Sequence, residues 1–469
     1  MPSNAESSRR RFLALAGTGV AALAGCANRT ESDTAASRTA TERPASTASE
    51  TPTTPPAADE TEAPADAIER QAVPVDLSAD SDGLDAVATR LATADIVGIG
   101  ENSHGVAAFK TIPRLLVRRL VDAHGFRLLA MEGTLGDFAS MNAYITGGDV
   151  DIETALSSLE FYFWRTAGIR RLFEWLREFN DDRPADDQVT VRGYDAQFHD
   201  VSATAIRSYL QRVDPSYLSE IGTNLEPLTE PRYERSDPAY MTPAQVSLVE
   251  SLRERLRMNR TDYVDRSSES EWRLARRHVW TLDRALRFQQ HLQAEAYTTG
   301  KRVRDASMAE NVAWLRDWSG ADRAVVLGNS NHTMRTDGDA EAERMGQHLT
   351  DEFGADYYSL GMLFGTGTFA APTNHDRTAF ETHALDGPVE GTLEAALADA
   401  SPTAFFLDFE AARENAALRA WLGGVSAVQF SVPRAANRGA IPLSAPPGTV
   451  YDGVVFVRDV SPASFVSGT

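Results

Sequence analysis

Seven short apolar runs of the kind that form buried strands punctuate the chain, and their order limits the folds that it can adopt. They are rich in β-branched and aromatic residues and cover residues 95–100, 127–132, 189–195, 323–329, 357–365, 403–409 and 452–459. Between the first two runs, "TIPRLLVRRLVDAHGF" repeats apolar residues at helical spacing until Gly125. Strand, helix and strand in that order predict a βαβ unit, so we expect an α/β fold with a mainly parallel central sheet flanked by helices.

Residues 200–318 have a different pattern. Long Arg/Glu-rich segments with helical periodicity, such as "PAQVSLVESLRERLRMNR", fill this stretch between the third and fourth strand runs. Residues 68–469 number about 400, more than the roughly 250 to 300 that one hydrophobic core usually serves. We therefore expect one main domain over 68–469 with an inserted helical lobe at about 200–318.

Residues 1–25 are typical of an export signal. Three arginines, Arg9–Arg11, precede a mostly apolar stretch that is shorter than the roughly 20 residues of a membrane span. Paired arginines followed by "FL" resemble the twin-arginine signal, and "LAGC" resembles the box before a lipidated cysteine. Cys26 is the only cysteine in the chain. We expect it to carry a lipid that holds the exported protein on the outer face of the cell membrane, and no disulfide can form within one chain.

Residues 26–67 are rich in Thr, Ala, Ser, Pro and acidic side chains, which cannot build a core, so we expect a disordered tether. The whole chain is acidic, with a net charge of −21, or −23 without residues 1–25. An acidic balance of this size suits a protein kept soluble at high salt, where screening weakens its self-repulsion. It argues against a nucleic-acid partner, which needs clustered basic surface.

Polar, titratable residues follow four of the predicted strands. They are Glu101 and His104 after the first run, Glu132 at the end of the second, Asp195 and Gln197 after the third, and His332 after the fourth. Ligand sites of parallel α/β sheets open at the carboxyl ends of the strands. Any one of these residues alone fits a helix cap or a loop contact, but four strands that each deliver such groups predict a functional site at one rim.

The motifs that carry these residues, taken in order, resemble a known family. "GIGENSHG", "HGFRLLAMEG", "RGYDAQ", "RVRDASMAENVAWL", "GNSNHTMR" and "YDGVVFVRDVSPA" are similar to motifs of the erythromycin esterase family over about residues 73–467. The resemblance implies an α/β fold with a helical lobe and a cleft in which a histidine activates water to hydrolyse a lactone. The implied partner is a small-molecule ester or lactone, and no cofactor is implied.

The resemblance also implies roles for single residues. His104 matches the general base, Glu101 and Glu132 match the active-site carboxylates, and His332 matches the second histidine. The chemistry agrees with these roles, because a free imidazole, with a pKa of about 6.5, accepts a proton from water near neutral pH, and a carboxylate behind it stabilises the imidazolium. His332 would polarise the carbonyl or protonate the leaving alkoxide.

Four more residues are candidates for a supporting or substrate-binding role. Arg304 and Asp305 lie in a family motif and are expected to form a buried ion pair, and the loop of Asp195 and Gln197 is implied to lie near the cleft.

The chain also departs from the family. Ala108 and Pro113 stand where members usually have a glutamate and an arginine, and Asn329 replaces the first histidine of an "HNxH"-like motif. Arg114, a further supporting candidate, comes one position late, and it would point elsewhere unless Pro113 resets the start of the helix.

Three alternatives stay open from the sequence. "GNSNH" partly imitates a nucleophile elbow with Ser330 as the nucleophile, but His332 occupies the place of the second glycine. Glu101, His104, Glu132 and His332 could instead hold a divalent metal, although no H-E-x-x-H or C-x-x-C spacing is present. The third alternative is a lipoprotein that binds a ligand in the cleft without cleaving it.

Overall fold

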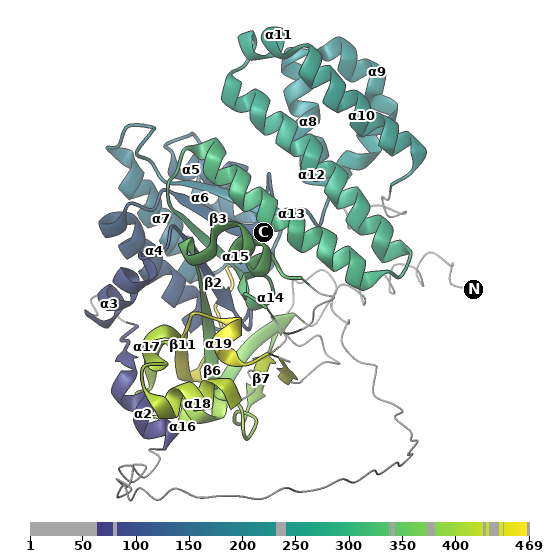
Figure 1. Cartoon of the computed structure of the whole chain (residues 1–469). Coiled ribbons are helices and arrows are strands. Elements are labelled where there is room, and N and C mark those ends of the chain that lie inside the picture. Colours follow the sequence, from purple (N-terminus) through teal and green to yellow (C-terminus); the bar gives the residue numbers. More distant parts are fainter. Residues whose placement is uncertain are drawn as a thin grey trace, which may run out of the picture. The chain divides into compact units, whose positions relative to one another are not determined.

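The computed structural model describes residues 63–77, 82–230, 241–336, 338, 343–372, 380–424, 428–430, 440–443 and 445–466. These residues belong to one compact unit, Ala63–Thr469, whose elements are labelled in Figure 1. The predicted signal peptide, Cys26 and nearly all of the predicted tether lie outside the described residues.

A mainly parallel sheet forms the centre of this unit (Figure 1). Its described strands are β1 (Val73–Pro74), β2 (Ile96–Glu101), β3 (Leu128–Thr134), β4 (Thr190–Asp195), β5 (Ala324–Asn329), β6 (Tyr357–Pro372), β7 (Phe380–Leu385), β8 (Ala404–Asp408) and β11 (Gly453–Val460). Their order is β1-β8-β11-β6-β2-β5-β3-β4, and β7 pairs with the distal end of β6. The strands from β11 to β4 run parallel, whereas β1, β7 and β8 pair antiparallel.

All seven apolar runs are strands of this sheet, so the predicted α/β class with a mainly parallel sheet is confirmed. The short β1, the hairpin strand β7 and a separate pair, β9 (Val428–Phe430) and β10 (Ala440–Pro442), did not stand out in the sequence.

Alternating side chains of the strands feed two apolar cores, one on each face of the sheet. Val97 belongs to the core on one face, while its neighbour Ile96 belongs to a core on the other. The first face is covered by α3 (Asp82–Leu91), α4 (Ala108–His124), α5 (Ala139–Ile145), α6 (Ile152–Ser157), η1 (Tyr162–Trp164) and α7 (Ala167–Asp181). The second is covered over β2, β3 and β5 by α13 (Tyr297–Ser319) and α15 (Met345–Phe353), next to α14 (Ser330–Thr333) and η3 (Gly354–Asp356).

A third apolar cluster covers β8 and β11 on that second face. It is built with α2 (Pro64–Gln71), α16 (Leu393–Asp399), α17 (Phe409–Ala412), α18 (Ala416–Gly424) and α19 (Pro447–Val450). The start of α2 differs from the expectation that the tether extends to residue 67. Its first turn forms earlier, from Pro64, because Ala67 and Ile68 are fully buried in this cluster.

The inserted lobe between β4 and β5 is helical, as predicted (Figure 1). It contains α8 (Asp200–Val213), α9 (Pro215–Leu225), η2 (Glu226–Thr229), α10 (Pro243–Met258), α11 (Arg260–Asp265) and α12 (Glu269–Gln293). These elements share an apolar core of their own. The helix that follows, α13, returns the chain to the sheet and buries Met308, Val312 and Leu315 against it.

The helix after β2 settles the position of Arg114. Pro113 does not reset the helix start, because α4 begins at Ala108 and contains Pro113 in its interior. The helix ends at Gly125, whose positive φ of 73° suits a left-handed cap. Arg114 is therefore not realigned with the position at which family members usually carry an arginine, and its side chain leaves the helix in a different direction.

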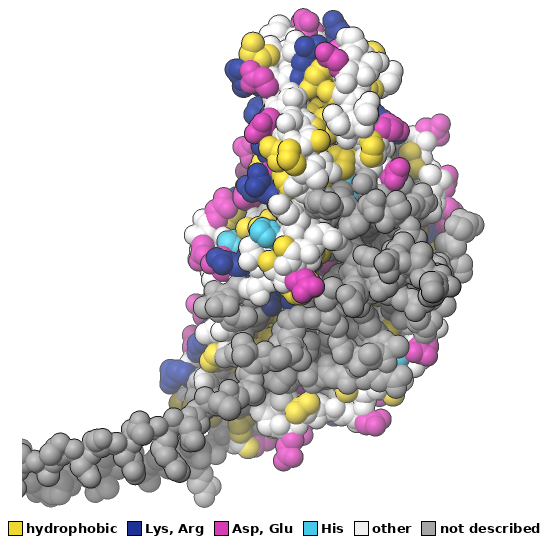
Figure 2. All heavy atoms as spheres, turned by 90° about the vertical axis from the view of Figure 1, so that its right-hand side faces the viewer, with side chains coloured by type: hydrophobic (Ala, Val, Ile, Leu, Met, Phe, Trp, Pro, Cys, Tyr) yellow, Lys and Arg dark blue, Asp and Glu magenta, His cyan; other side chains and the backbone are white. Residues whose placement is uncertain are grey.

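Two surface properties complete the description. Among the described residues, no helix is long and apolar enough to span a membrane. On the face drawn in Figure 2, the acidic side chains of the described part are scattered among arginines rather than gathered in one patch.

Candidate active site

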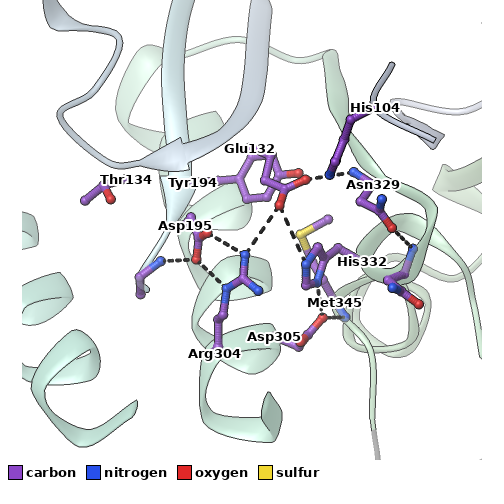
Figure 3. A network of polar contacts seen from close by, with 12 residues as sticks. His104, Glu132, Thr134, Tyr194, Asp195, Arg304, Asp305, Asn329, His332 and Met345 are labelled. Atoms are coloured by element: carbon purple, nitrogen blue, oxygen red, sulfur yellow. Dashed lines mark hydrogen bonds and ion pairs between the residues drawn. The ribbon is translucent and has the colours of Figure 1, made fainter. Parts of the chain in front are cut away.

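Polar side chains from four neighbouring strands meet at the carboxyl edge of the sheet. Glu101 is the last residue of β2, Glu132 lies near the end of β3, Asp195 ends β4 and Asn329 ends β5. These strands are consecutive in the sheet and parallel, which brings their ends to the same side. Figure 3 shows the network that Glu132, Asp195 and Asn329 form with side chains of α13 and α14.

The carboxylate of Glu101 contacts one ring nitrogen of His104 and so fixes the orientation of the ring. The Nδ1 atom of His104 lies 2.6 Å from Oε1 of Glu101, while Nζ of Lys110 donates to Oε2 at 2.5 Å. The ring of His104 stacks on Phe163 with centroids 3.9 Å apart and planes 2° from parallel. In the described part of the chain, Nε2 of His104 has no hydrogen-bond partner, and Figure 3 shows the ring pointing toward the Glu132 and Asn329 side of the network.

Glu132 is presented by an irregularity of β3. The register with β4 shifts between Met131 and Thr134, so Glu132 lies in a bulge, a feature that re-aims side chains at strand ends. Its backbone carbonyl accepts from Nε1 of Trp164 at 2.6 Å, and its Oε2 accepts from the backbone N–H of Asn329 at 2.8 Å. Gly328 makes this approach feasible, because a Cβ there would lie 2.2 Å from the hydroxyl of Tyr194 and 3.2 Å from Oε2 of Glu132.

Arg304 joins two of the strand ends. Its guanidinium forms two hydrogen bonds with the buried Asp195, at 3.0 and 2.7 Å, and a longer one with Oε1 of Glu132 at 3.4 Å. Burial by itself lowers the pKa of Arg304, but the charges of Asp195 and Glu132 outweigh it and raise that pKa above its ordinary value. Arg304 therefore stays charged and fixes both carboxylates.

His332 has a carboxylate partner of its own. Its Nδ1 lies 2.7 Å from Oδ1 of Asp305, which also accepts from the backbone N–H of Met345 at 3.0 Å. The opposite ring nitrogen, Nε2, lies 3.7 Å from Oε1 of Glu132. Burial opposes ionisation of Asp305, but the nearby His332, Arg344 and Arg304 prevail and lower its pKa. Asp305 thus pairs with His332 rather than with Arg304 as expected from the sequence.

Two predicted supporting residues form no hydrogen bond or ion pair with this network in the part of the chain that the structure describes. Arg114 is half-buried, and burial, followed by the neighbouring charges of Arg171 and Arg118, lowers its pKa. Gln197 is also half-buried, and its side chain forms no hydrogen bond within the described residues.

Two contributors were not predicted. Lys110 is fixed to Glu101, and Trp164 is fixed to Glu132. A signal for Lys110 was present in the sequence, because it is one of only two lysines in the chain and follows His104 by six residues. Trp164 carried no such signal, since its approach to Glu132 depends on the packing of η1 against β3.

The arrangement disfavours two of the alternative mechanisms. Ser330 is fully buried in the first turn of α14, and the histidine two residues later is bonded to Asp305 instead. Each carboxylate of the predicted metal set already lies beside a cation, Glu101 beside the buried Lys110 and Glu132 beside the half-buried Arg304. Among the described residues, no group of three or more His, Cys, Asp or Glu side chains is arranged to hold a metal ion.

Several buried polar atoms at this rim have no partner in the described part of the chain. They are both side-chain amide atoms of Asn102 and the hydroxyls of Ser103, Thr134 and Thr333. Buried groups of this kind normally bind water or a ligand.

A cavity of about 460 Å³ opens elsewhere, between α10, α12 and α13. Arginines, Trp280 and Trp314 are among the residues that line it, and none of the site residues does.

Comparison with known proteins gives this arrangement a class. The erythromycin esterase model matches residues 121–460. Erythromycin esterase type II of Escherichia coli is 24% identical over 352 residues, which cover 67% of this chain and 80% of that protein.

Two solved structures resemble the fold. A protein from Bacillus cereus superimposes with a TM-score of 0.73 at 19% identity, covering 86% of this chain and 98% of the other. The erythromycin esterase EreC, solved as a histidine-to-asparagine mutant in its open conformation, gives a TM-score of 0.61 at 17% identity, covering 83% of this chain and 98% of the other.

The fold and the comparisons together define an ester hydrolase. Since the family model spans well over half of the sequence, the chain belongs to the erythromycin esterase family, as its motifs predicted.

Proposed function

We propose that this protein hydrolyses a carboxylic ester or lactone by direct attack of water, with His104 as the general base. The observation that carries the proposal is the contact of 2.6 Å between Glu101 and Nδ1 of His104, which leaves Nε2 as the free nitrogen of the ring. A histidine held in this way accepts a proton at Nε2 while the carboxylate stabilises the charge that appears on the ring.

In the proposed reaction, Nε2 of His104 takes a proton from water as the water oxygen bonds to the ester carbonyl carbon. The carbonyl electrons move to oxygen, and collapse of this intermediate breaks the bond to the alcohol oxygen. The departing alkoxide then takes a proton, either back from His104 or from His332. We assign His332 to the second role or to polarising the carbonyl, because its Nε2 faces Glu132 and its Nδ1 is bonded to Asp305.

We infer that the substrate is an uncharged small molecule with an apolar part. An aromatic cluster lies behind the proposed base, since Phe163 stacks on His104 and contacts Phe161 and Tyr162. The relative from Escherichia coli is by its name an erythromycin esterase, which makes macrolide lactones the first substrates to test. A net charge of −21 disfavours strongly anionic substrates at low salt.

The decisive experiment measures hydrolysis of aryl esters and macrolactones by the full chain in detergent and molar salt, with and without a chelator. Wild type is compared with His104→Ala and with His124→Ala, a matched control at the far end of α4. Activity that survives the chelator and is lost only in His104→Ala supports the proposal. Loss of activity with the chelator favours a metal-dependent hydrolase, and no turnover by a folded protein favours a ligand-binding lipoprotein.

We also propose that the protein is exported and anchored to the outer face of the cell membrane by a lipid on Cys26. The support is the run Arg9–Arg11, the apolar stretch after it and the "LAGC" box. Expression of Cys26→Ser should move the protein from the membrane fraction to the medium. An unchanged membrane fraction would contradict the anchor, and retention of an Arg9→Lys/Arg10→Lys variant inside the cell would support the twin-arginine route.

A further inference from the structure

Lys110 stands out because a lysine is rare in this chain and a buried lysine is rarer. The chain uses arginine for nearly all its positive charge, and Lys110 and Lys301 are its only lysines. Lys110 lies in the first turn of α4 with a side chain that is only 2% exposed. A buried ammonium is costly unless it is paired, so its partner identifies its role.

The partner of Lys110 is the carboxylate behind His104. Glu101 is itself buried, and its two oxygens are divided between Nδ1 of His104 and Nζ of Lys110. The ammonium also lies 4.9 Å from the ring centre of Trp164 and 5.6 Å from that of Phe163. Burial lowers the pKa of Lys110, while the charges of Glu101 and Glu132 act in the opposite direction.

Resting on the proposed role of His104 as the base, we propose that Lys110 is a positioning residue that keeps Glu101 ionised and thereby dictates which nitrogen of His104 carries the proton. An ionised Glu101 only accepts hydrogen bonds, so Nδ1 of His104 must carry the proton, and Nε2 is left with the lone pair that attack on water requires. Without the ammonium, burial favours the neutral acid. A protonated Glu101 would donate to Nδ1, the proton of the ring would move to Nε2, and the histidine could no longer act as a base toward water.

The chemistry of the side chain explains why this one position is not arginine. A lysine ammonium is compact, and here one carboxylate and two aromatic rings surround it. A guanidinium carries five N–H donors in a wide plane, and several of them would lie unpaired against Phe163 and Trp164.

The test compares Lys110→Met, which keeps the length of the side chain and removes its charge, with Lys301→Met as the matched control. The charged or titratable groups that bear on Lys110 are Glu101, Glu132 and, through Glu101, His104. Because a neighbouring cation favours the carboxylate form, its loss should move the acidic limb of the kcat/KM profile to higher pH by about 1 to 3 units and lower kcat at pH 7 at least about 10-fold. A lower kcat with an unmoved acidic limb would reduce Lys110 to a packing role and overturn the proposal.

A second readout does not depend on turnover. Nitrogen-15 NMR of the histidine rings, with His104 assigned by its loss in His104→Ala, should report the Nδ1–H form in wild type and the Nε2–H form in Lys110→Met. This measurement separates the two hypotheses, because an Nδ1–H ring in a protein without esterase activity would support the role of Lys110 while the proposed reaction fails. An Nε2–H ring in wild type would overturn the role of Lys110 by itself.

Folding of the variants is checked by near-ultraviolet circular dichroism. If Lys110→Met does not fold, Lys110→Gln retains a hydrogen-bond donor toward Glu101 without the charge and should show the same change of tautomer. Lys110→Arg should not restore wild-type kcat, for the reasons of size and unpaired donors given above.

Discussion

The site contains two histidines that are each backed by a carboxylate, and the two pairs are built differently. Glu101 ends β2 and His104 lies in the loop that follows, three residues later, whereas Asp305 and His332 come from α13 and α14 and are 27 residues apart. The second oxygen of Glu101 is bound by the ammonium of Lys110. Asp305 is supported by a neutral donor, the backbone N–H of Met345.

This difference gives the two rings different surroundings. His104 has an aromatic ring on its face and a free Nε2, while Nε2 of His332 is directed at the carboxylate of Glu132. A carboxylate only accepts hydrogen bonds, so a ring nitrogen directed at it is the one that carries a proton, as a proton donor must. This difference is the reason for proposing His104 as the base and His332 as the acid, and each variant below tests one part of that proposal.

The largest effect is expected for the first pair. His104→Gln removes the proposed base and should lower kcat about 10³-fold, within the range of roughly 10² to 10⁴ that general-base catalysis supplies. Steady-state ester hydrolysis in molar salt measures it, with His124→Gln as the control. Residual activity above a tenth of wild type would assign the base to another group.

A smaller effect is expected for the second pair. His332→Gln should lower kcat about 10²-fold, comparable to the loss of one group that stabilises developing charge. The loss should shrink for esters with good leaving groups, such as nitrophenyl esters, because these alcohols need little help from an acid. An equal loss for good and poor leaving groups would move His332 from the acid role to polarising the carbonyl.

A buried histidine that has no carboxylate partner among the described residues, His278, tests what the carboxylates contribute. His278 lies beside Ser202 at 3.3 Å, and burial, aided by the charge of Arg192, lowers its pKa to about 4. Above pH 6.5 the ring is neutral in both states. As the pH falls from 6.5 toward 4, the unfolded chain binds the proton first, so the free energy of unfolding should decrease.

Between pH 7 and pH 5 this decrease should amount to about 2 kcal/mol, since each pH unit below 6.5 costs about 1.4 kcal/mol. Urea unfolding of wild type and His278→Gln at both pH values measures it. The variant should lose less stability on acidification, and an identical loss in both proteins would show that His278 is not the group responsible.

The smallest effect is expected for the partner of His332. Asp305→Asn keeps an oxygen that accepts from Met345 and removes the charge behind the ring. The expected cost is about 10-fold in kcat/KM, the lower end for losing a group that orients a functional histidine. Glu101→Asn in the other pair should cost more, because it leaves Lys110 as a buried unpaired charge, and the reverse order would contradict the comparison.

The sequence predicted much of the sheet because apolar strand runs are local signals. Six of the seven runs, including those that end near Glu132 and Asn329, are strands within two residues of their expected bounds, whereas β6 continues seven residues beyond the expected end, to Pro372. The short β1 and the antiparallel β7 were missed, since their pairing with β8 and β6 comes from distant parts of the chain. The helix expected from Thr111 onward begins three residues earlier, at Ala108, so Pro113 lies in its interior and does not reset its start.

By itself the sequence determined the fold class, the family and the closeness of Glu101 to His104, because periodicity, motif order and a spacing of three residues are properties of the chain alone. Tertiary structure decided the rest. The order of the strands placed β5 between β2 and β3, and so brought Asn329 to Glu132. It also paired Asp305 with His332 rather than with Arg304, and it buried Lys110 against Glu101, behind His104. Such contacts join residues far apart in sequence or depend on which face of a helix is buried, and only the packed core fixes both.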